Sequence, residues 1–275
     1  MTNMASGVRL TALYVPGSRP DRFDKAVASG ADVVIIDLED AVAPTDKPAA
    51  RIAVEQWYGN ATHEVPVQLR INAFGTPWFD EDVALAGRLR GIEVRVPKVE
   101  SVEAIPRLPG VPVCALIETA LGLERAFDIA RAPEVSSIAL GDNDLAGDLG
   151  SSSVAVLDWA RIRLVVAARA AGLPAPMMSV YPSIADLAGL EADTVRGAGL
   201  GMIGRTAAHP SQLAPIVRAF RPTAEQLAWA VEVEVALAAG GGATRLPSGA
   251  MVDAAMAATA VRIRALDAAT GTLGG

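Results

Sequence analysis

Short hydrophobic runs recur along the chain, and stretches of helical character separate them. Asp32–Ile36 is a continuous apolar run, which is typical of a strand buried on both faces of a parallel sheet. The strands predicted in this way are Leu10–Val15, Asp32–Ile36, Val65–Arg70, Glu93–Val96, Val113–Ile117, Ser137–Leu140, Met177–Val180 and Leu200–Ile203. The helices predicted between and after them are Asp21–Ser29, Pro44 to about Tyr58, Asp80–Arg90, Leu121–Arg131, Trp159–Ala171, Ile184–Gly197, Ser211–Phe220 and Thr223–Ala239.

Eight strands that alternate with helices favour a TIM (β/α)₈ barrel over an open doubly wound sheet. The chain has no early GxGxxG motif, so nothing in it supports a dinucleotide-binding fold. We expect residues 1–239 to form the barrel, and residues 240–275 to form a linker and a C-terminal helical lid or arm. The linker is Gly240–Ala243 and the helix is Ser248–Asp267. This helix is expected to pack either on a neighbouring subunit or on its own barrel.

Composition narrows the classes of function. The chain has 275 residues, 51% of them hydrophobic, and a formal net charge of −7 without a basic block. An acidic chain of this kind is a poor candidate for binding nucleic acid or a membrane surface. It contains one cysteine, Cys114, so no internal disulfide can form, and its start has no secretory pattern. No stretch approaches the ~18 consecutive apolar residues of a membrane span. We therefore expect a cytoplasmic protein.

Charged residues follow the predicted strands, and two of them suggest a metal site. Glu118 directly follows the strand Val113–Ile117, and Asp144 follows the strand Ser137–Leu140. Neighbouring parallel strands place their carboxyl ends at one edge of a sheet, where α/β proteins position their chemistry. Two carboxylates without a nearby Cys or His suit Mg²⁺, or Mn²⁺, rather than zinc.

Other charged residues are expected on the same rim, and they would allow it to bind an anion beside the metal. They are Asp37, Glu39 and Asp40 after the second strand, Arg70 after the third and Lys98 after the fourth. The alternative is that each is a solvated loop residue or a helix N-cap, and Asp37 and Asp40 fit that role best. Lys98 would also suit Schiff-base chemistry, but nothing near it in sequence indicates a depressed pKa. His209, before a proline, is either a base or a structural residue.

The motifs resemble those of the citrate lyase beta-subunit-like (CitE-like) acyl-CoA lyases of the HpcH/HpaI aldolase superfamily. The resemblance covers nearly the whole chain, and its pieces fall in the family's order. They are LYVPGSRPDRFDKA, VVIIDLEDAVAPTDKPAAR, LRINAFGT, VPKVES, ALIETALGL, GDNDLAGDLG, HPSQLAPIVRAF and, more weakly, GAMVDAA. The resemblance implies a TIM barrel that binds Mg²⁺ and cleaves or forms a carbon–carbon bond in a 3-hydroxyacyl-CoA. Malyl-CoA and citramalyl-CoA, which give acetyl-CoA and a 2-oxoacid, represent this substrate class.

The resemblance also implies roles for individual residues. Glu118 and Asp144 would be the metal ligands, and Arg70 would contact the oxoacid carboxylate and the thioester oxygen. Asp253 would be the lid aspartate and the catalytic acid or base, reaching a neighbouring subunit's site in a homotrimer or hexamer. The acidic residues that support Arg70 would be Asp37, Glu39 and Asp40. The residues along the coenzyme A and substrate would be Tyr14, Pro16, Ser18, Arg19, Arg22, Arg70 and Lys98.

Several positions depart from the family pattern and leave other functions open. These positions are Asn143, Ser179, Pro182, Arg205 and the Ala207-Ala208 pair before His209. One alternative is a class II-type aldolase that acts on free oxoacids such as pyruvate, without coenzyme A. Another is a citrate lyase beta subunit that acts within a complex on a carrier-bound citryl thioester. The 275-residue chain is short for the family, which favours a stand-alone enzyme over such a complex.

Overall fold

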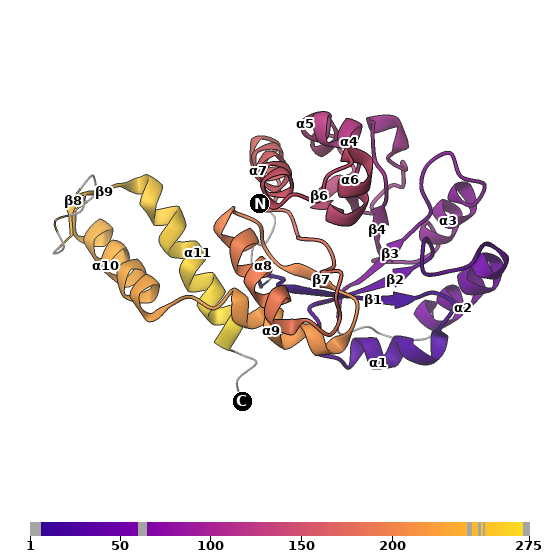
Figure 1. Ribbon diagram of the computed structural model, residues 1–275, viewed down its shortest axis with the longest axis horizontal. Coiled ribbons are helices and arrows are strands. Elements are labelled where there is room, and N and C mark those ends of the chain that lie inside the picture. Colours follow the sequence, from indigo (N-terminus) through magenta and orange to yellow (C-terminus); the bar gives the residue numbers. More distant parts are fainter. Residues whose placement is uncertain (1–6, 60–64, 241–243, 247–248, 250, 272–275) are drawn as a thin grey trace.

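The computed structural model describes residues 7–59, 65–240, 244–246, 249 and 251–271. Its body is a parallel seven-stranded sheet in the order β6-β5-β4-β3-β2-β1-β7, with helices packed around it (Figure 1). The strands are β1 (Thr11–Pro16), β2 (Val33–Asp37), β3 (Val67–Arg70), β4 (Glu93–Val96), β5 (Val113–Ile117), β6 (Val135–Leu140) and β7 (Arg205–Ala207). All residues of β2 and β5 are buried, as their apolar sequences require.

The prediction of a regular strand at Met177–Val180 was wrong. In this segment Met177 makes one isolated parallel bridge to Ala139 of β6, and Met178 makes one to Arg205 of β7. The segment therefore runs between the two edge strands of the sheet and connects them through single bridges. Pro176 and Pro182 flank this short segment and lack the N–H groups that a longer ladder would use.

The predicted strand at Leu200–Ile203 was also wrong. Leu200 caps the preceding helix, with its N–H donated to the carbonyls of Arg196 and Gly197. Gly201 follows with a φ of +98°, a conformation that turns the chain out of the helix. The last strand of the sheet begins five residues later than predicted, at Arg205, and pairs with β1.

Most predicted helices exist, with changed bounds. The predicted helix Leu121–Arg131 is divided at Arg125, and the one predicted at Asp80–Arg90 ends at Ala86. The helices of the body are α1 (Phe23–Val27), α2 (Lys47–Gly59), α3 (Phe79–Ala86), α4 (Ala120–Glu124), α5 (Ala126–Ala130), α6 (Asp142–Leu149), α7 (Val154–Ala170), α8 (Leu187–Gly199) and α9 (Leu213–Ala219). The short 3-10 helices are η1 (Pro20–Arg22), η2 (Pro44–Asp46), η3 (Val102–Ala104) and η4 (Pro210–Gln212).

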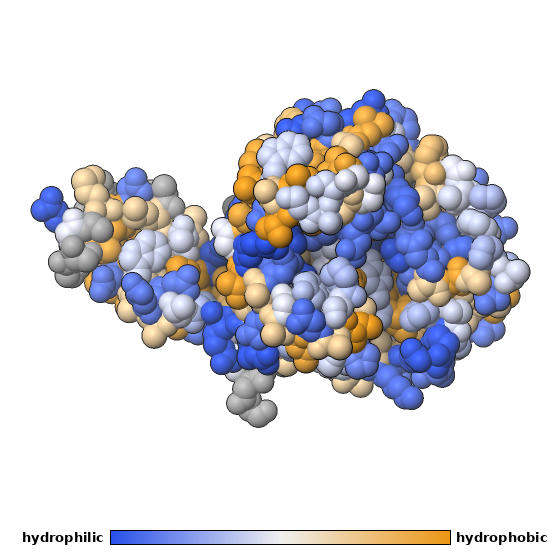
Figure 2. Space-filling model, viewed as in Figure 1, coloured by the Kyte–Doolittle hydropathy of each residue, from blue (hydrophilic) through white to orange (hydrophobic). Residues whose placement is uncertain are grey.

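The C-terminal part of the chain forms an arm that projects from the body (Figure 1). It consists of α10 (Ala224–Gly240), α11 (Ala254–Gly271) and a short antiparallel pair, β8 (Thr244–Arg245) and β9 (Met251–Val252). The helix predicted at Ser248–Asp267 is α11, which begins at Ala254 because Met251 and Val252 form β9. Of the predicted linker Gly240–Ala243, the last three residues lie outside the described part of the chain. In Figure 2 the arm is a separate lobe on which apolar and polar residues mix.

The arm has a small apolar core of its own, in which Ala230, Val233, Leu246, Val252 and Ala260 are buried. Near its end α11 returns to the body, where Leu266 and Ala269 pack against the main core. Across the described ranges, no helix combines the length and apolar character needed to cross a bilayer.

Candidate active site

Arg70 is held by carboxylates at the carboxyl end of the sheet. It is the last residue of β3, and the parallel register places it beside Asp37, the last residue of β2. Its Nε donates to Asp37 Oδ1 at 2.8 Å and its Nη2 donates to Oδ2 at 2.7 Å. The Nη1 atom lies 2.9 Å from Glu39 Oε2 and 3.7 Å from Asp40 Oδ2. Although burial disfavours the cation, the bonds to Asp37 keep the pKa of Arg70 raised, so the guanidinium stays charged.

Glu39 links Arg70 to Lys98, because its Oε1 accepts from Lys98 Nζ at 2.8 Å. Burial raises the pKa of Glu39, while Arg70 and Lys98 oppose that shift. Burial disfavours the charged form of Lys98 as well, but the bond to Glu39 raises its pKa overall. Lys98 therefore remains an ammonium group, which gives no support to Schiff-base chemistry at this residue.

Glu118 is a buried carboxyl whose pKa is strongly raised. It follows β5, is 2% exposed, and its Oε1 accepts the backbone N–H of Lys98 at 2.8 Å. Lys98 has a φ of +50°, the single positive value for a non-glycine residue in the described ranges. Burial, and then the charges of Glu39 and Asp144, raise the pKa of Glu118 to about 8. A carboxylate in this environment is stabilised by a cation.

Gly141 makes room for this carboxylate. It follows β6, which pairs with β5, and its N–H donates to the Ile117 carbonyl at 2.9 Å. A Cβ atom at position 141 would lie 2.4 Å from Glu118 Oε2 and 2.5 Å from Glu118 Cβ. Only glycine therefore fits beside Glu118 here without a displacement.

These residues surround a cavity of about 390 Å³. Its charged or phenolic lining residues are Tyr14, Asp37, Asp40, Arg70, Arg95, Glu118 and Asp144. The Tyr14 ring centroid lies 4.8 Å from the Arg70 guanidinium carbon. The structure thus brings both predicted metal ligands and the predicted substrate arginine to one cavity.

The donor set of this cavity fits Mg²⁺. Glu118 and Asp144 are hard oxygen donors, and among the described residues no hydrogen bond or ion pair engages the Asp144 carboxylate. In the described ranges no group of three or more His, Cys, Asp and Glu side chains is placed to hold a metal. Mg²⁺ is usually held by one or two carboxylates, and it fills its other positions with water or substrate oxygens. Two carboxylates are therefore sufficient for it.

Other predicted site residues lie outside the cavity lining. Pro16, Ser18, Arg19 and Arg22 follow or end β1 at the same rim, and Arg19 is paired with Asp21. His209 caps η4 by accepting the Ser211 N–H at Nδ1, which supports its structural role.

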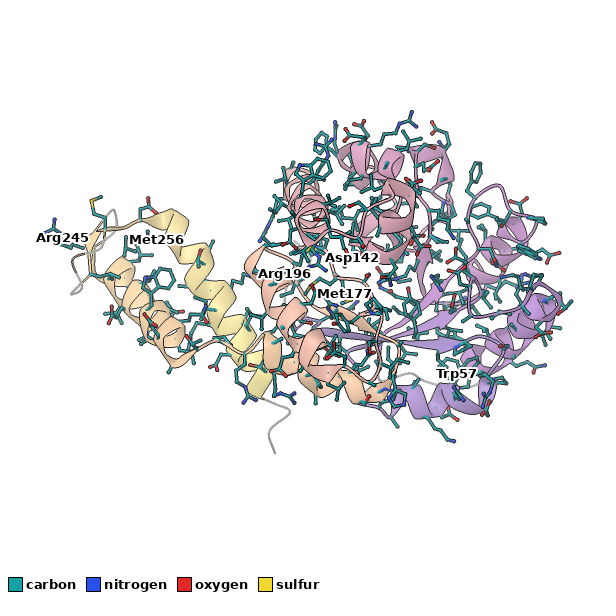
Figure 3. All side chains as sticks on the ribbon, in the orientation of Figure 1. Trp57, Asp142, Met177, Arg196, Arg245 and Met256 are labelled. Atoms are coloured by element: carbon teal, nitrogen blue, oxygen red, sulfur yellow. The ribbon has the colours of Figure 1, made fainter. Side chains whose placement is uncertain are left out.

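Asp253 lies between β9 and α11, at the end of the arm remote from the body (Figure 1). Figure 3 labels the nearby Met256 there, far from Asp142 beside the cavity. Within one chain, then, the structure does not bring Asp253 to the other site residues.

The sequence did not indicate that Lys47 supports the rim. Its Nζ is buried and donates to the carbonyls of Leu38 and Glu39 at 2.7 and 2.8 Å, and to Asn72 Oδ1 at 2.7 Å. It thereby ties the loop after β2 to the loop after β3. The segment VVIIDLEDAVAPTDKPAAR contains Lys47, but only the fold shows which oxygens it meets.

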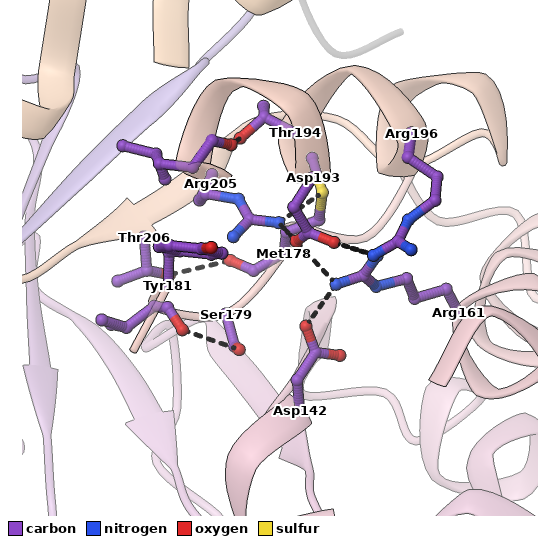
Figure 4. Close-up of polar contacts among 12 residues, drawn as sticks. Asp142, Arg161, Met178, Ser179, Tyr181, Asp193, Thr194, Arg196, Arg205 and Thr206 are labelled. Carbon is purple, nitrogen blue, oxygen red and sulfur yellow. Dashed lines mark hydrogen bonds and ion pairs between the residues drawn. The ribbon is translucent and has the colours of Figure 1, made fainter. Parts of the chain in front are cut away.

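A second unpredicted network holds the start of α6 (Figure 4). Arg161 of α7 donates to Asp142 Oδ2 at 2.8 Å and to Asp193 of α8 at 3.0 and 3.1 Å. Asp193 also pairs with the buried Arg205 of β7. Although burial opposes it, Arg161 and Arg205 lower the pKa of Asp193. Asp142, two residues before Asp144, is thus an anchor of the helix that carries the predicted ligand.

Comparisons with known proteins find relatives over most of the chain. The family model described as HpcH/HpaI aldolase/citrate lyase matches residues 10–210. An L-malyl-CoA/beta-methylmalyl-CoA lyase of Rhodobacter capsulatus is 32% identical over 290 residues, covering 88% of this chain and 89% of the relative. A (3S)-malyl-CoA thioesterase of Cereibacter sphaeroides is 35% identical over 225 residues, covering 79% of each chain. The structure of CitE from Mycobacterium tuberculosis with magnesium, acetoacetate and coenzyme A has 33% identity and a TM-score of 0.82, covering 95% of this chain and 98% of CitE.

Proposed function

Because the chain belongs to the HpcH/HpaI aldolase/citrate lyase family, we propose that it is a Mg²⁺-dependent carbon–carbon lyase. It cleaves, or forms, a 3-hydroxyacyl-CoA such as malyl-CoA or citramalyl-CoA, with acetyl-CoA and a 2-oxoacid as the other side of the reaction. One observation carries the proposal: a cavity of about 390 Å³ holds the fixed cation Arg70 opposite Glu118 and Asp144. This arrangement can bind a metal and a carboxylate side by side.

Glu118 and Asp144 would hold the metal. When bound, Mg²⁺ supplies Lewis acidity and a template for the substrate's hydroxyl and carboxylate oxygens. The buried position of Glu118 and the neighbouring carboxylates favour the bound cation, because it compensates their negative charge. The Lys98 N–H fixes Oε1 of Glu118, and Oε2 lies beside Gly141, which lines the cavity.

Arg70 provides positive charge that needs no rearrangement during the reaction. The two hydrogen bonds that it donates to Asp37 fix the plane of the guanidinium, and the Tyr14 ring covers it. A fixed cation there can bind the oxoacid carboxylate and stabilise the negative charge that develops on the thioester oxygen when the carbon–carbon bond breaks. The substrate would meet Arg70 and Lys98, and the acids Asp37, Glu39 and Asp40 would hold these two cations in position.

We assign the proton transfer to Asp253 of a neighbouring copy. It would protonate the carbon of the acetyl-CoA enolate in cleavage, or remove that proton in condensation. The arm places Asp253 far from its own cavity, and large apolar side chains such as Val235, Met251 and Val261 are more than half exposed on it. A homotrimer or hexamer in which each arm covers the next chain's cavity would bury them and complete the site.

Further parts of the assignment follow the same family pattern. Coenzyme A would lie along Pro16, Ser18, Arg19 and Arg22, next to the Tyr14 side of the cavity.

We propose that the sheet closes as a complete (β/α)₈ barrel through Met177 and Met178, which the two isolated bridges support. The division of the chain into a barrel, 1–239, and a lid, 240–275, stays a prediction. Nearly all of α10 falls within the predicted barrel segment, but in the structure it packs with the rest of the arm. The buried free thiol of Cys114 fits a cytoplasmic enzyme.

A product screen by mass spectrometry tests the reaction. The purified protein is offered acetyl-CoA or propionyl-CoA with glyoxylate or pyruvate and Mg²⁺, and new acyl-CoA masses are sought. We expect a 3-hydroxyacyl-CoA that Glu118→Gln fails to form. Release of free CoA from the offered acyl-CoA, without a 3-hydroxyacyl-CoA product, would instead indicate a thioesterase. Turnover of pyruvate aldols without CoA, or of a carrier-bound citryl thioester alone, would favour the other two functions.

A further inference from the structure

A second cavity lies at the opposite edge of the sheet from Arg70 and Glu118. Its volume is about 630 Å³, larger than the 390 Å³ of the candidate active site. Its walls come from the amino-terminal ends of the strands, including Val33, the first residue of β2, and Glu93, the first residue of β4. Among their described lining residues the two cavities share Arg95, and every other residue belongs to one of them. The second cavity is therefore a separate site.

The second cavity is positively charged, although the whole chain has a net charge of −7. Four arginines and one glutamate, Glu93, are found among its described lining residues. Glu93 accepts hydrogen bonds from Gln68 Nε2 at 2.9 Å and Ser136 Oγ at 3.2 Å, and Arg9 Nη1 lies 3.7 Å from its Oε2. The Nε of Arg95 donates to Gln68 Oε1. Glu93 thus has its partners in Gln68, Ser136, Arg9 and, through its charge, Arg95, and it leaves Arg169 and Arg262 uncompensated.

Arg169 of α7 and Arg262 of α11 line the cavity, and within the described ranges neither forms an ion pair. Arg262 donates from Nη2 to the carbonyl of Met202 at 3.2 Å, which is a neutral partner. Burial lowers the pKa of Arg262, and the charge of Arg169 lowers it further. These two guanidinium groups therefore repel each other at the cavity. An anion bound to both would remove the repulsion and accept their unused N–H groups.

The remaining wall is largely apolar. Ala12, Val33, Met177 and Ile203 contribute to it. Inorganic phosphate would meet the arginines but would leave this surface uncovered. A ligand that satisfies both parts of the cavity carries a charged head and a hydrophobic body.

We propose that this cavity is a second ligand site, which binds a small carboxylate with an apolar body. The carboxylate lies between Arg169 and Arg262, and the body packs against the apolar ends of the strands. The site goes beyond the lyase reaction, since it uses none of the residues assigned to that reaction. Arg95, which lines both cavities, is the one residue through which an occupant can affect the active site directly.

Calorimetric titration of the full chain with octanoate tests the site. Octanamide, a neutral molecule of the same length, and inorganic phosphate serve as the comparison probes. The informative variant is Arg169→Gln, because this side chain is on the exposed edge of the cavity. Its matched control is Arg163→Gln, which removes the same charge from the same helix, where Arg163 pairs with Glu124 at 2.8 Å outside the cavity.

We expect octanoate to bind, and Arg169→Gln to weaken it about tenfold, as loss of a charge-assisted bond implies. Arg163→Gln should bind as the wild type does, and octanamide and phosphate should bind more weakly than octanoate. Octanoate affinity that is unchanged in Arg169→Gln, or no octanoate binding at millimolar concentration, would overturn the site. If octanamide bound as tightly as octanoate, the ligand would not need a charged head. If phosphate bound as tightly, the ligand would not need an apolar body. Lyase activity of Arg169→Gln without ligand should equal the wild-type value.

Discussion

Gly141 and Glu118 lie so close together that a Cβ atom at position 141 would stand 2.4 Å from the carboxylate oxygen Oε2. The contact arises because β5 and β6 are neighbours in the sheet and both residues follow the ends of these strands. Real Cβ atoms do not approach an oxygen this closely, so any larger residue would displace Glu118. The backbone of one strand end therefore sets the position of the predicted metal ligand on the next.

We expect Gly141→Ala to lower both Mg²⁺ affinity and turnover, by roughly 10-fold to 100-fold, as for changes that misplace a ligand. Gly147→Ala is the matched control, since Gly147 lies in α6 and a Cβ there would meet nothing within 4 Å. Measuring activity as a function of Mg²⁺ concentration gives both the Mg²⁺ affinity and the turnover of each variant. Equal Mg²⁺ affinity of the two variants would show that the position of Glu118 is not critical.

Removing either carboxylate charge should remove the metal. We predict that Glu118→Gln and Asp144→Asn each lower kcat by roughly 10³ or more, as loss of a catalytic metal implies. Asp148→Asn is the control for surface charge, since it is an exposed change in the same helix as Asp144 and its amide oxygen can still accept the Ala120 N–H. The wild-type enzyme should lose its activity in excess chelator and regain it with added Mg²⁺. Near-wild-type turnover of Glu118→Gln would refute the assignment of this residue.

Arg70→Lys keeps the positive charge but loses the two-point contact with Asp37. We expect kcat/KM to fall by roughly 10²-fold or more, because a lysine cannot reproduce a fixed, planar pair of donors. Arg88→Lys provides the comparison, since Arg88 forms a similar two-point contact with Glu55 on the exposed surface. Steady-state kinetics with varied oxoacid in the condensation direction separate the variants. An unchanged KM and kcat in Arg70→Lys would exclude it from substrate binding.

Complementation between variants tests the role of Asp253 in a neighbouring site. Asp253→Ala and Glu118→Gln should each be inactive alone. If each cavity uses its own Glu118 and another chain's Asp253, an equal mixture allowed to exchange subunits should recover about a quarter of wild-type activity by random assembly. A mixture that stays inactive after exchange, shown by mass spectrometry of the assemblies, would place Asp253 outside the neighbouring site.

Much of the sheet and its charged rim could be predicted because both depend on neighbours in sequence. Strands such as Val113–Ile117 are continuous apolar runs, and the residue that follows each one lies at the carboxyl edge. The parallel register then places Asp37 beside Arg70 although 33 residues separate them. The last strand was misplaced because its own residues are not a continuous apolar run. The apolar residues Leu200–Ile203 follow a helix end, whereas β7 contains the buried polar residues Arg205 and Thr206.

The supporting cations could not be predicted, because their partners come from distant parts of the chain. Arg205 is tolerated in a buried strand because Asp193 of α8 forms an ion pair with it. Lys47, at the start of α2, donates a hydrogen bond to Asn72 in the loop after β3. A sequence pattern reports whether a residue is polar, but it does not report which carboxylate will face it after folding. The same limit applied to Asp253, whose place at the end of an arm depends on how α10 and α11 pack.

The raised pKa of Glu118 predicts how pH affects the metal-free protein. Burial, Glu39 and Asp144 raise this pKa from 4.5 to about 8, while the N–H and the charge of Lys98 oppose the shift. Between these two values the folded state binds a proton that the unfolded state has released, so the stability from this residue falls as pH rises toward and through 8. Mg²⁺ needs the ionised form and compensates its charge. It should therefore raise Tm more at pH 8.5 than at pH 6.

Thermal unfolding at these two pH values, with EDTA or with Mg²⁺, measures this linkage. In Glu118→Gln, which cannot ionise, we expect the metal-free protein to lose less stability between pH 6 and pH 8.5, and Mg²⁺ to have little effect at either pH. Asp148→Asn should keep the wild-type response, because this carboxylate is exposed and lines no part of the cavity. A Mg²⁺-induced rise in Tm that is equal at both pH values would show that Glu118 is already ionised at pH 6, and that its neighbours compensate its charge without a metal.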